Sequence, residues 1–239
     1  MTTIAAVAVA VVLAIGAYRY LGSEAPVPAA SAEPAQSAPA TVAQAAPAPA
    51  PATTAKQEPL PATPAILPQA ILGREDAPVT MIEFSSLTCG HCGNFHRETL
   101  PKLKKAYIDT GKLRLVLRDF PLDRLALAAS MLPHCAGPQR YFGFIDVLFH
   151  SQETWATSKD PLKELEKVAR LGGLSAEEFD KCLANQSLAT AIRDRADADG
   201  KAFGIDATPT FRIGDTQLVG DKPFEAFAKV IDDALKAAK

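Results

Sequence analysis

The segment EFSSLTCGHC constrains this chain most, because it places Cys89 and Cys92 two residues apart directly after an apolar run. Residues 78–86 are short and mostly apolar, which predicts a buried strand. The following residues, GNFHRETLPKLKKAYIDTG, predict a helix that Pro101 should kink. The two cysteines are therefore expected where a buried strand gives way to a helix.

Three kinds of site can place two cysteines at this spacing. A structural zinc site needs two further ligands at metal spacing. The chain has no second such motif, and His134 and Cys135 fall in a separate predicted helix, so no metal and no cofactor are expected. A structural disulfide across so short a loop would remove little entropy from the unfolded chain. A redox-active cysteine pair is the interpretation that we adopt.

The position of the first cysteine suggests how such a pair would work. Cys89 should lie at a helix N-terminus, where free N–H groups and the helix dipole stabilise a thiolate. His91 could add a positive charge or a hydrogen bond, which would lower the pKa of Cys89 further. A pair whose reduced form is stabilised is a strong oxidant of other thiols. Cys92, one turn into the helix, should be buried and should resolve mixed disulfides.

The N-terminal part of the chain differs from the rest in composition. Residues 4–21 are almost entirely apolar, and the run is intermediate in length between the core of an export signal and a membrane-spanning helix. Residues 1–23 are therefore predicted to be an uncleaved signal anchor or a cleaved signal peptide. Residues 24–67 are rich in alanine and proline, which predicts a disordered, extended spacer.

Residues 68–239 are long enough for one compact α/β domain. A strand is predicted over 112–120 and a hairpin over 208–220, with a block of helices between them and a final helix after Pro223. One helix of the block should begin at Asp160 and Pro161. One face of this helix is predicted to carry Leu162, Leu165, Val168 and Leu171.

The cysteine motif, the later segment GIDATPTF and the helical block between them appear in a recognisable order. Together they resemble the DsbA branch of the thioredoxin-fold disulfide oxidoreductases, over nearly all of residues 70–239. The resemblance implies a thioredoxin fold with a helical insertion at about 121–205.

The same resemblance assigns roles to single residues. It implies that Cys89 is the sulfur that substrates attack and that Cys92 resolves the mixed disulfide. It implies a cis peptide bond before Pro209, which would place Thr208 opposite the cysteines as a substrate-binding residue; an ordinary edge-strand proline is the alternative. Glu83 takes the place of the family's buried acid, which would accept the proton of Cys92, unless it is an exposed carboxylate at the strand end.

Two further cysteines, Cys135 and Cys182, fall in the helical block. In an oxidising compartment two such cysteines usually pair, and some DsbA-like proteins carry a second disulfide in the insertion, so a structural bridge is predicted. Two free buried thiols are the alternative. His96, His134 and His150 have no evident partner in the sequence and are assigned to helix surfaces or to packing.

The predicted function is thiol:disulfide interchange in the periplasm or cell envelope, with oxidation of reduced polypeptides favoured. The resemblance implies reoxidation by a membrane quinone-linked partner. The Gly-His dipeptide and the threonine before Pro209 also occur in isomerases, so reduction or isomerisation is the first alternative. A non-catalytic peptide-binding holdase is the second. The net charge of −2 and the absence of a basic block argue against nucleic acid as a partner.

Overall fold

The computed structural model describes residues 67–238. The predictions for the signal or anchor segment, and for nearly all of the Ala/Pro-rich spacer, lie outside these residues. Within 67–238, no helix combines the length and the apolar character needed to cross a membrane.

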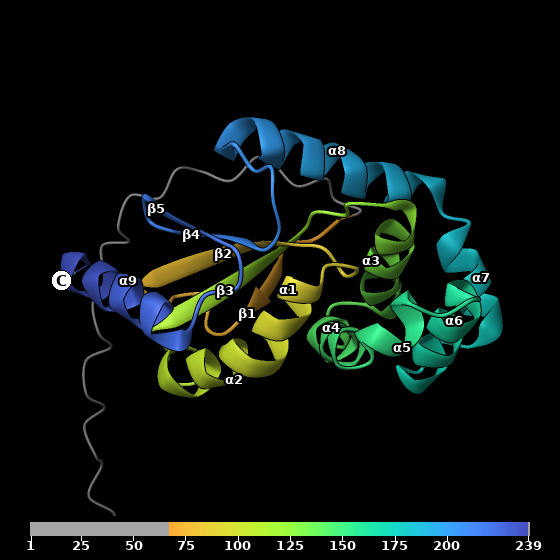
Figure 1. Cartoon of the computed structure of the whole chain (residues 1–239), viewed down its shortest axis with the longest axis horizontal. Helices are drawn as coiled ribbons and strands as arrows, with labels where there is room; N and C mark the ends of the chain where they lie inside the picture. The colour runs from red at the N-terminus through yellow and green to blue at the C-terminus, as the bar shows by residue number, and fades with distance from the viewer. Residues whose placement is uncertain (1–66, 239) are drawn as a thin grey trace, which may run out of the picture. The chain divides into compact units, whose positions relative to one another are not determined.

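A five-stranded mixed sheet with the order β1-β3-β2-β4-β5 forms the core of the fold (Figure 1). The strands are β1 (Ala70–Leu72), β2 (Val79–Ser85), β3 (Leu113–Asp119), β4 (Thr210–Ile213) and β5 (Thr216–Val219). β2 is parallel to β3 and antiparallel to β4, while β1 and β5 pair antiparallel at the two edges. The predicted strands and hairpin are confirmed. The three-residue β1 was not predicted, since so short a strand shows no alternating pattern.

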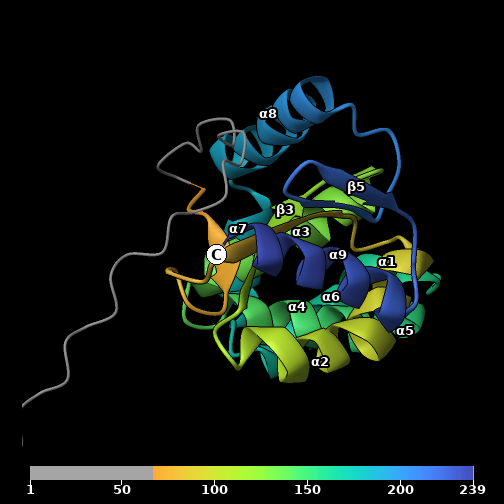
Figure 2. The same cartoon turned by 90° about the vertical axis from the view of Figure 1, so that its left-hand side faces the viewer.

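Helices cover both faces of the sheet (Figure 2). One face packs against the helical segment that follows the cysteines and against α9 (Phe224–Ala237). That segment is continuous and consists of α1 (Gly90–Asn94), η1 (Phe95–Thr99), α2 (Leu100–Leu103) and η2 (Lys104–Ile108). Its turns on either side of α2, which contains Pro101, are π-helical, so the proline lies in a helix with widened turns. Phe203 and Ile205, at and just beyond the end of α8, cover the other face.

The helical block forms an insertion between β3 and β4, as predicted (Figure 1). Its helices are α3 (Arg124–Ala136), α4 (Tyr141–His150), α5 (Gln152–Ala156), α6 (Pro161–Leu171), α7 (Ala176–Leu183) and α8 (Gln186–Phe203). They share one apolar core, which includes the buried Phe149 and Trp155 and extends to Cys92 of α1. The insertion and the strand–helix junction are therefore packed against each other.

The start of α6 agrees with the prediction, but the buried part of the helix is narrower than the predicted apolar face. The Asp160 side chain caps the helix by accepting a hydrogen bond from the backbone N–H of Lys163. Of the four apolar residues predicted on one face, Leu165 and Val168 are buried, whereas Leu162 and Leu171 are 49% and 82% exposed. Only the middle of the helix packs against its neighbours, and these two residues lie in its first turn and at its last position.

Candidate active site

The strand–helix junction places the two cysteines in different environments. Cys89 has an extended backbone, with φ −79° and ψ 117°, and α1 begins at the next residue, so Cys89 is the N-cap of the helix. A cysteine at this position faces the unsatisfied N–H groups of the first helical turn. Cys89 is half-buried, whereas Cys92 is completely buried. Both are free thiols in the structure.

The thiolate of Cys89 is stabilised by several hydrogen-bond donors. The pKa of Cys89 is lowered from its ordinary value of 9.0 to about 5. The largest cause is a hydrogen bond from the Cys92 side chain; the Thr208 side chain and the backbone N–H groups of Cys92 and His91 add to it, and partial burial opposes it. His91 is exposed and acts here through its backbone, not through the charge on its ring. The pKa of Cys89 is therefore low, as expected, and the part of the shift that comes from His91 is a backbone hydrogen bond.

Cys92 is shifted in the opposite direction. Burial is the main reason why its pKa lies far above the ordinary value, and the neighbouring Cys89 and Glu83 raise it further. Cys89 is therefore the sulfur that reaches solvent as a thiolate, while Cys92 is held as a thiol. This difference suits a pair in which one sulfur exchanges with substrates and the other closes the internal disulfide.

The loop before β4 lies directly against the reactive sulfur. The peptide bond between Thr208 and Pro209 is cis, as the resemblance implied. The Cys89 thiol donates a hydrogen bond to the backbone carbonyl of Thr208, with 3.3 Å between Sγ and O. Residues more than a hundred positions apart therefore form the two sides of one site.

Glu83 is fully buried in β2, and His96 is its partner. Nε2 of His96 lies 3.0 and 3.1 Å from the two carboxylate oxygens of Glu83, and the two side chains are 3% and 0% exposed. The imidazole also stacks on Phe149 of α4, with ring centroids 4.1 Å apart. His96 is thus a packing residue, one of the two expected roles, and the sequence could not name its partner because the pair joins a strand to a helix and its geometry depends on the tertiary fold.

The thioredoxin family model matches residues 67–233, a range that contains the cysteine pair, the buried acid and the cis-proline loop. The chain belongs to the thioredoxin family. Within it, the chain is DsbA-like. It superposes on the crystal structure of alpha-DsbA1 from Wolbachia pipientis with a TM-score of 0.68, at 35% sequence identity over 75% of this chain and 94% of that one.

Curated relatives agree with this placement. A Rickettsia conorii protein named as a protein-disulfide oxidoreductase is 31% identical over 170 residues, which are 71% of this chain and 61% of that protein. Disulfide bond formation protein D of Bacillus subtilis is 28% identical over 72% of this chain and 80% of its own length. The chain thus spans less than two thirds of the length of the Rickettsia relative.

The DsbA-like domain has a second buried polar cluster at the end of β3. Asp119 accepts hydrogen bonds from His134 at 2.8 Å and from Arg195 at 2.6 Å, and the hydroxyl of Tyr141 lies 3.4 Å away. Burial opposes ionisation of Asp119, but His134 and Arg195 hold its pKa below the ordinary value. The sequence could not name this partner of His134 either, whereas His150 lies on a helix surface beside Asp146, as expected.

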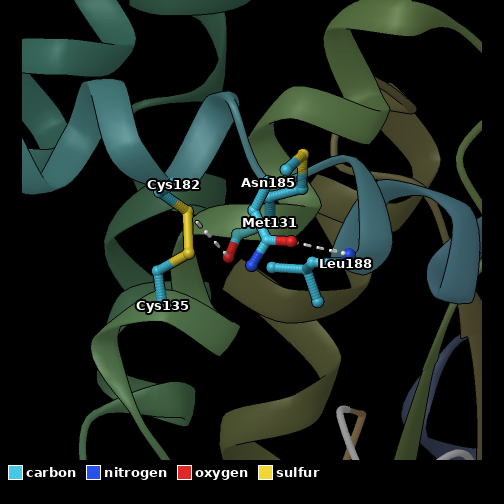
Figure 3. Close-up of a disulfide and its surroundings, with 5 residues drawn as sticks. All are labelled: Met131, Cys135, Cys182, Asn185 and Leu188. Atoms are coloured by element: carbon cyan, nitrogen blue, oxygen red, sulfur yellow. Dashed lines mark hydrogen bonds between the residues drawn. A yellow bond between two sulfur atoms is a disulfide. The ribbon is translucent and has the colours of Figure 1, made fainter.

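Cys135 and Cys182 form a disulfide that joins α3 to α7, with their Cα atoms 6.0 Å apart (Figure 3). The Met131 carbonyl lies 3.4 Å from the sulfur of Cys182. The predicted bridge is therefore present, and it lies in the insertion, apart from Cys89 and Cys92. In residues 67–238 there is no group of three or more Cys, His, Asp or Glu side chains that could hold a metal ion.

Proposed function

We propose that this protein catalyses thiol:disulfide exchange in the cell envelope and oxidises cysteine pairs in reduced polypeptides. The observation that carries the proposal is the contrast between Cys89, a half-exposed and acidic thiol against Thr208 and Pro209, and Cys92, which is buried and held as a thiol. Stabilisation of the reduced form favours the transfer of the internal disulfide to a substrate.

The exchange begins with the oxidised pair. A substrate thiolate attacks Sγ of Cys89, the bond between Cys89 and Cys92 breaks, and its electron pair passes to Cys92, which takes up a proton. The second substrate thiolate then attacks the substrate sulfur of the mixed disulfide, and Cys89 leaves as a thiolate. The substrate has lost two electrons and the cysteine pair has gained them. A low pKa makes Cys89 a good leaving group in the second step.

The substrate should approach along the cis-proline loop. The backbone next to Pro209 is in position to pair with an extended polypeptide whose cysteine reaches Cys89, as in recognition by strand addition. Glu83 is buried and acts on Cys92 electrostatically, which supports a role in accepting and returning the proton of that thiol.

Regeneration requires an electron acceptor. We propose a membrane quinone-linked partner that reoxidises the reduced pair, with residues 4–21 holding the protein at the membrane or directing its export. The Cys135–Cys182 disulfide supports an oxidising compartment, since such bonds rarely persist where thiols are kept reduced.

The reduction potential of the Cys89–Cys92 pair tests the direction of the reaction. The protein would be equilibrated with glutathione buffers at pH 7 and the redox state read by alkylation and mass spectrometry. A potential near or above about −150 mV supports disulfide donation. A potential near −250 mV or below means that the pair retains its disulfide, and the assignment as an oxidase is then wrong.

Replacing Cys89 by Ser separates the enzyme from a holdase. The variant should no longer oxidise a reduced dithiol peptide, and it should no longer form covalent complexes with clients. If the variant still binds unfolded clients and prevents their aggregation as well as the unchanged protein, peptide binding and not exchange is the main activity.

A further inference from the structure

We infer that Gln152, a residue of the insertion, is a positioning residue for Cys89 and thereby sets the redox equilibrium of the cysteine pair. The inference rests on the proposed function in one respect only, namely that the pair cycles between disulfide and dithiol. Through Gln152, the insertion would act on the backbone of Cys89.

The contact is a single side-chain amide that donates to two backbone carbonyls. Nε2 of Gln152 lies 2.8 Å from the carbonyl oxygen of Leu87 and 2.9 Å from that of Cys89. The two acceptors flank the loop by which β2 enters α1, and one belongs to the reactive cysteine itself. Gln152 begins α5, which follows β3 and α4 in the chain, so the link crosses from the insertion to the thioredoxin core.

The surroundings of the amide are closely fitted. Gln152 is 4% exposed, and a buried amide is expected to make its hydrogen bonds within the protein. A Cβ atom at Gly93 would collide with Oε1 of Gln152, and it would lie 2.7 Å from Nη1 of Arg97, at the flexible end of that side chain. The glycine that follows Cys92 therefore provides the space that this amide occupies.

The amide acts on the atoms that determine where the sulfur lies. The carbonyl of Cys89 also accepts the backbone N–H of Gly93, at 3.1 Å, as part of the first turn of α1. Gln152 holds the same carbonyl from the other side, and it fixes the peptide group that precedes Thr88. With both peptide groups held, the Cys89 side chain is directed at the backbone N–H groups of the first helical turn, which stabilise its thiolate.

Asp123 anchors the same loop from a second helix of the insertion. The hydroxyl of Thr88 donates to its carboxylate at 2.6 Å, and Asp123 is the N-cap of α3. This contact is exposed, and the loop takes part in it only through the side-chain hydroxyl of Thr88, so it holds the Cys89 backbone less directly than Gln152 does. The buried amide of Gln152 is consequently the contact that holds the Cys89 backbone most directly.

The first test replaces Gln152 by Met, which keeps the length of the side chain and removes the donor. Loss of two hydrogen bonds to the loop should shift the glutathione equilibrium of the pair toward the disulfide by about tenfold, and the Cys89 thiolate absorbance should titrate at a higher pH. Gln186→Met, an exposed change at the start of α8, is the matched control and should leave both readouts unchanged. Circular dichroism would verify that the Gln152 variant is folded.

A double-mutant cycle with Gly93 removes the ambiguity of a single variant. Gly93→Ala should displace the amide and shift the equilibrium in the same direction as Gln152→Met. Gln152→Ala removes the collision between the amide and the added methyl group and leaves only the flexible end of the Arg97 side chain to move. In that background Gly93→Ala should therefore cost much less than it does alone. Additive effects of the two changes, or an unchanged equilibrium in a folded Gln152→Met protein, overturn the inference. A reducing potential in the unchanged protein would instead contradict the proposed function and leave this comparison intact.

Discussion

Cys89 and Cys92 show how strongly position decides the chemistry of identical side chains. Both lie within one turn of helix, but Cys89 meets donors at the helix N-terminus, while Cys92 is surrounded by the apolar core and by Glu83. The pKa of the first thiol falls to about 5 and that of the second rises. The two shifts predict different responses to pH.

The reduced protein should gain stability relative to the oxidised protein as pH rises from about 5 toward 9, the interval between the folded-state pKa of Cys89 and its ordinary value. In this interval the folded state carries a thiolate and the unfolded state a thiol, so the unfolded state binds more protons and unfolding becomes harder as pH rises. Denaturant unfolding of both redox forms at several pH values measures the effect. Cys89→Ser, which cannot form the disulfide and lacks this thiol, should not gain stability over the interval, and a pH-independent difference between the two forms of the unchanged protein would contradict the shifted pKa.

The pairing of Glu83 with His96 predicts a cost when one partner is removed. His96→Leu should lower the free energy of unfolding by about 1–3 kcal/mol, because a buried carboxylate loses its hydrogen-bond donor. Glu83→Gln added to this variant should recover part of the loss, since the remaining group is then uncharged. If the double variant is less stable than His96→Leu, the pair does not stabilise the fold in this way.

Glu83→Gln alone tests the proton transfer at Cys92. If Glu83 accepts the proton of Cys92, resolution of a mixed disulfide at Cys89 should slow by about 10²-fold, the usual effect of losing a general base. The mixed disulfide between Cys89 and a peptide would be prepared, the reaction would be quenched with acid at successive times, and release of the peptide would be measured. Glu178→Gln, an exposed change in α7, serves as a control. An unchanged rate removes Glu83 from the mechanism.

Among the secondary-structure elements, α3 and α7 are joined covalently. Their disulfide closes a sequence separation of 47 residues, for which the chain-entropy model gives a stabilisation of about 4 kcal/mol. Cys135→Ala combined with Cys182→Ala should lower the free energy of unfolding by an amount of this order, measured with denaturant. Thiol titration of the unfolded, unreduced protein provides a check, because two additional reactive thiols would show that the bridge is not formed.

The elements that could be predicted are those that local sequence determines. The alternation of residues 112–120 predicted β3, and Asp160 marked a helix start that the structure caps as expected. What could not be predicted are contacts between elements. The partner of His96 lies on a strand before the cysteines, and the acceptors for Gln152 are backbone carbonyls, which leave no trace in the sequence. The order of the motifs therefore predicted where the site lies, but the buried contacts that hold its residues in place depend on tertiary packing.

For the whole molecule, the apolar residues 4–21 predict that the folded domain lies outside the cytoplasm. Protease added to intact spheroplasts should therefore cleave the domain or its spacer, and a chain lacking residues 1–23 should become protected. Mass spectrometry of the mature N-terminus distinguishes a cleaved signal from an anchor. Protection of the unchanged protein until the cells are lysed would contradict the proposed location.

The order of the four cysteines along the chain bears on how the protein itself is made. Synthesis releases a polypeptide from its N-terminus, so Cys89 and Cys92 emerge together, followed by Cys135 and later by Cys182. Each cysteine thus has its partner as its nearest cysteine in the sequence. Cys89 and Cys92 can pair before Cys135 emerges, so they are not left as free thiols beside it. The Cys135–Cys182 bond, together with the pairing proposed for Cys89 and Cys92, is the connectivity that vectorial emergence favours among those that four cysteines allow. Under the proposed function, a protein that introduces disulfides into others can in this way acquire its own without an isomerase.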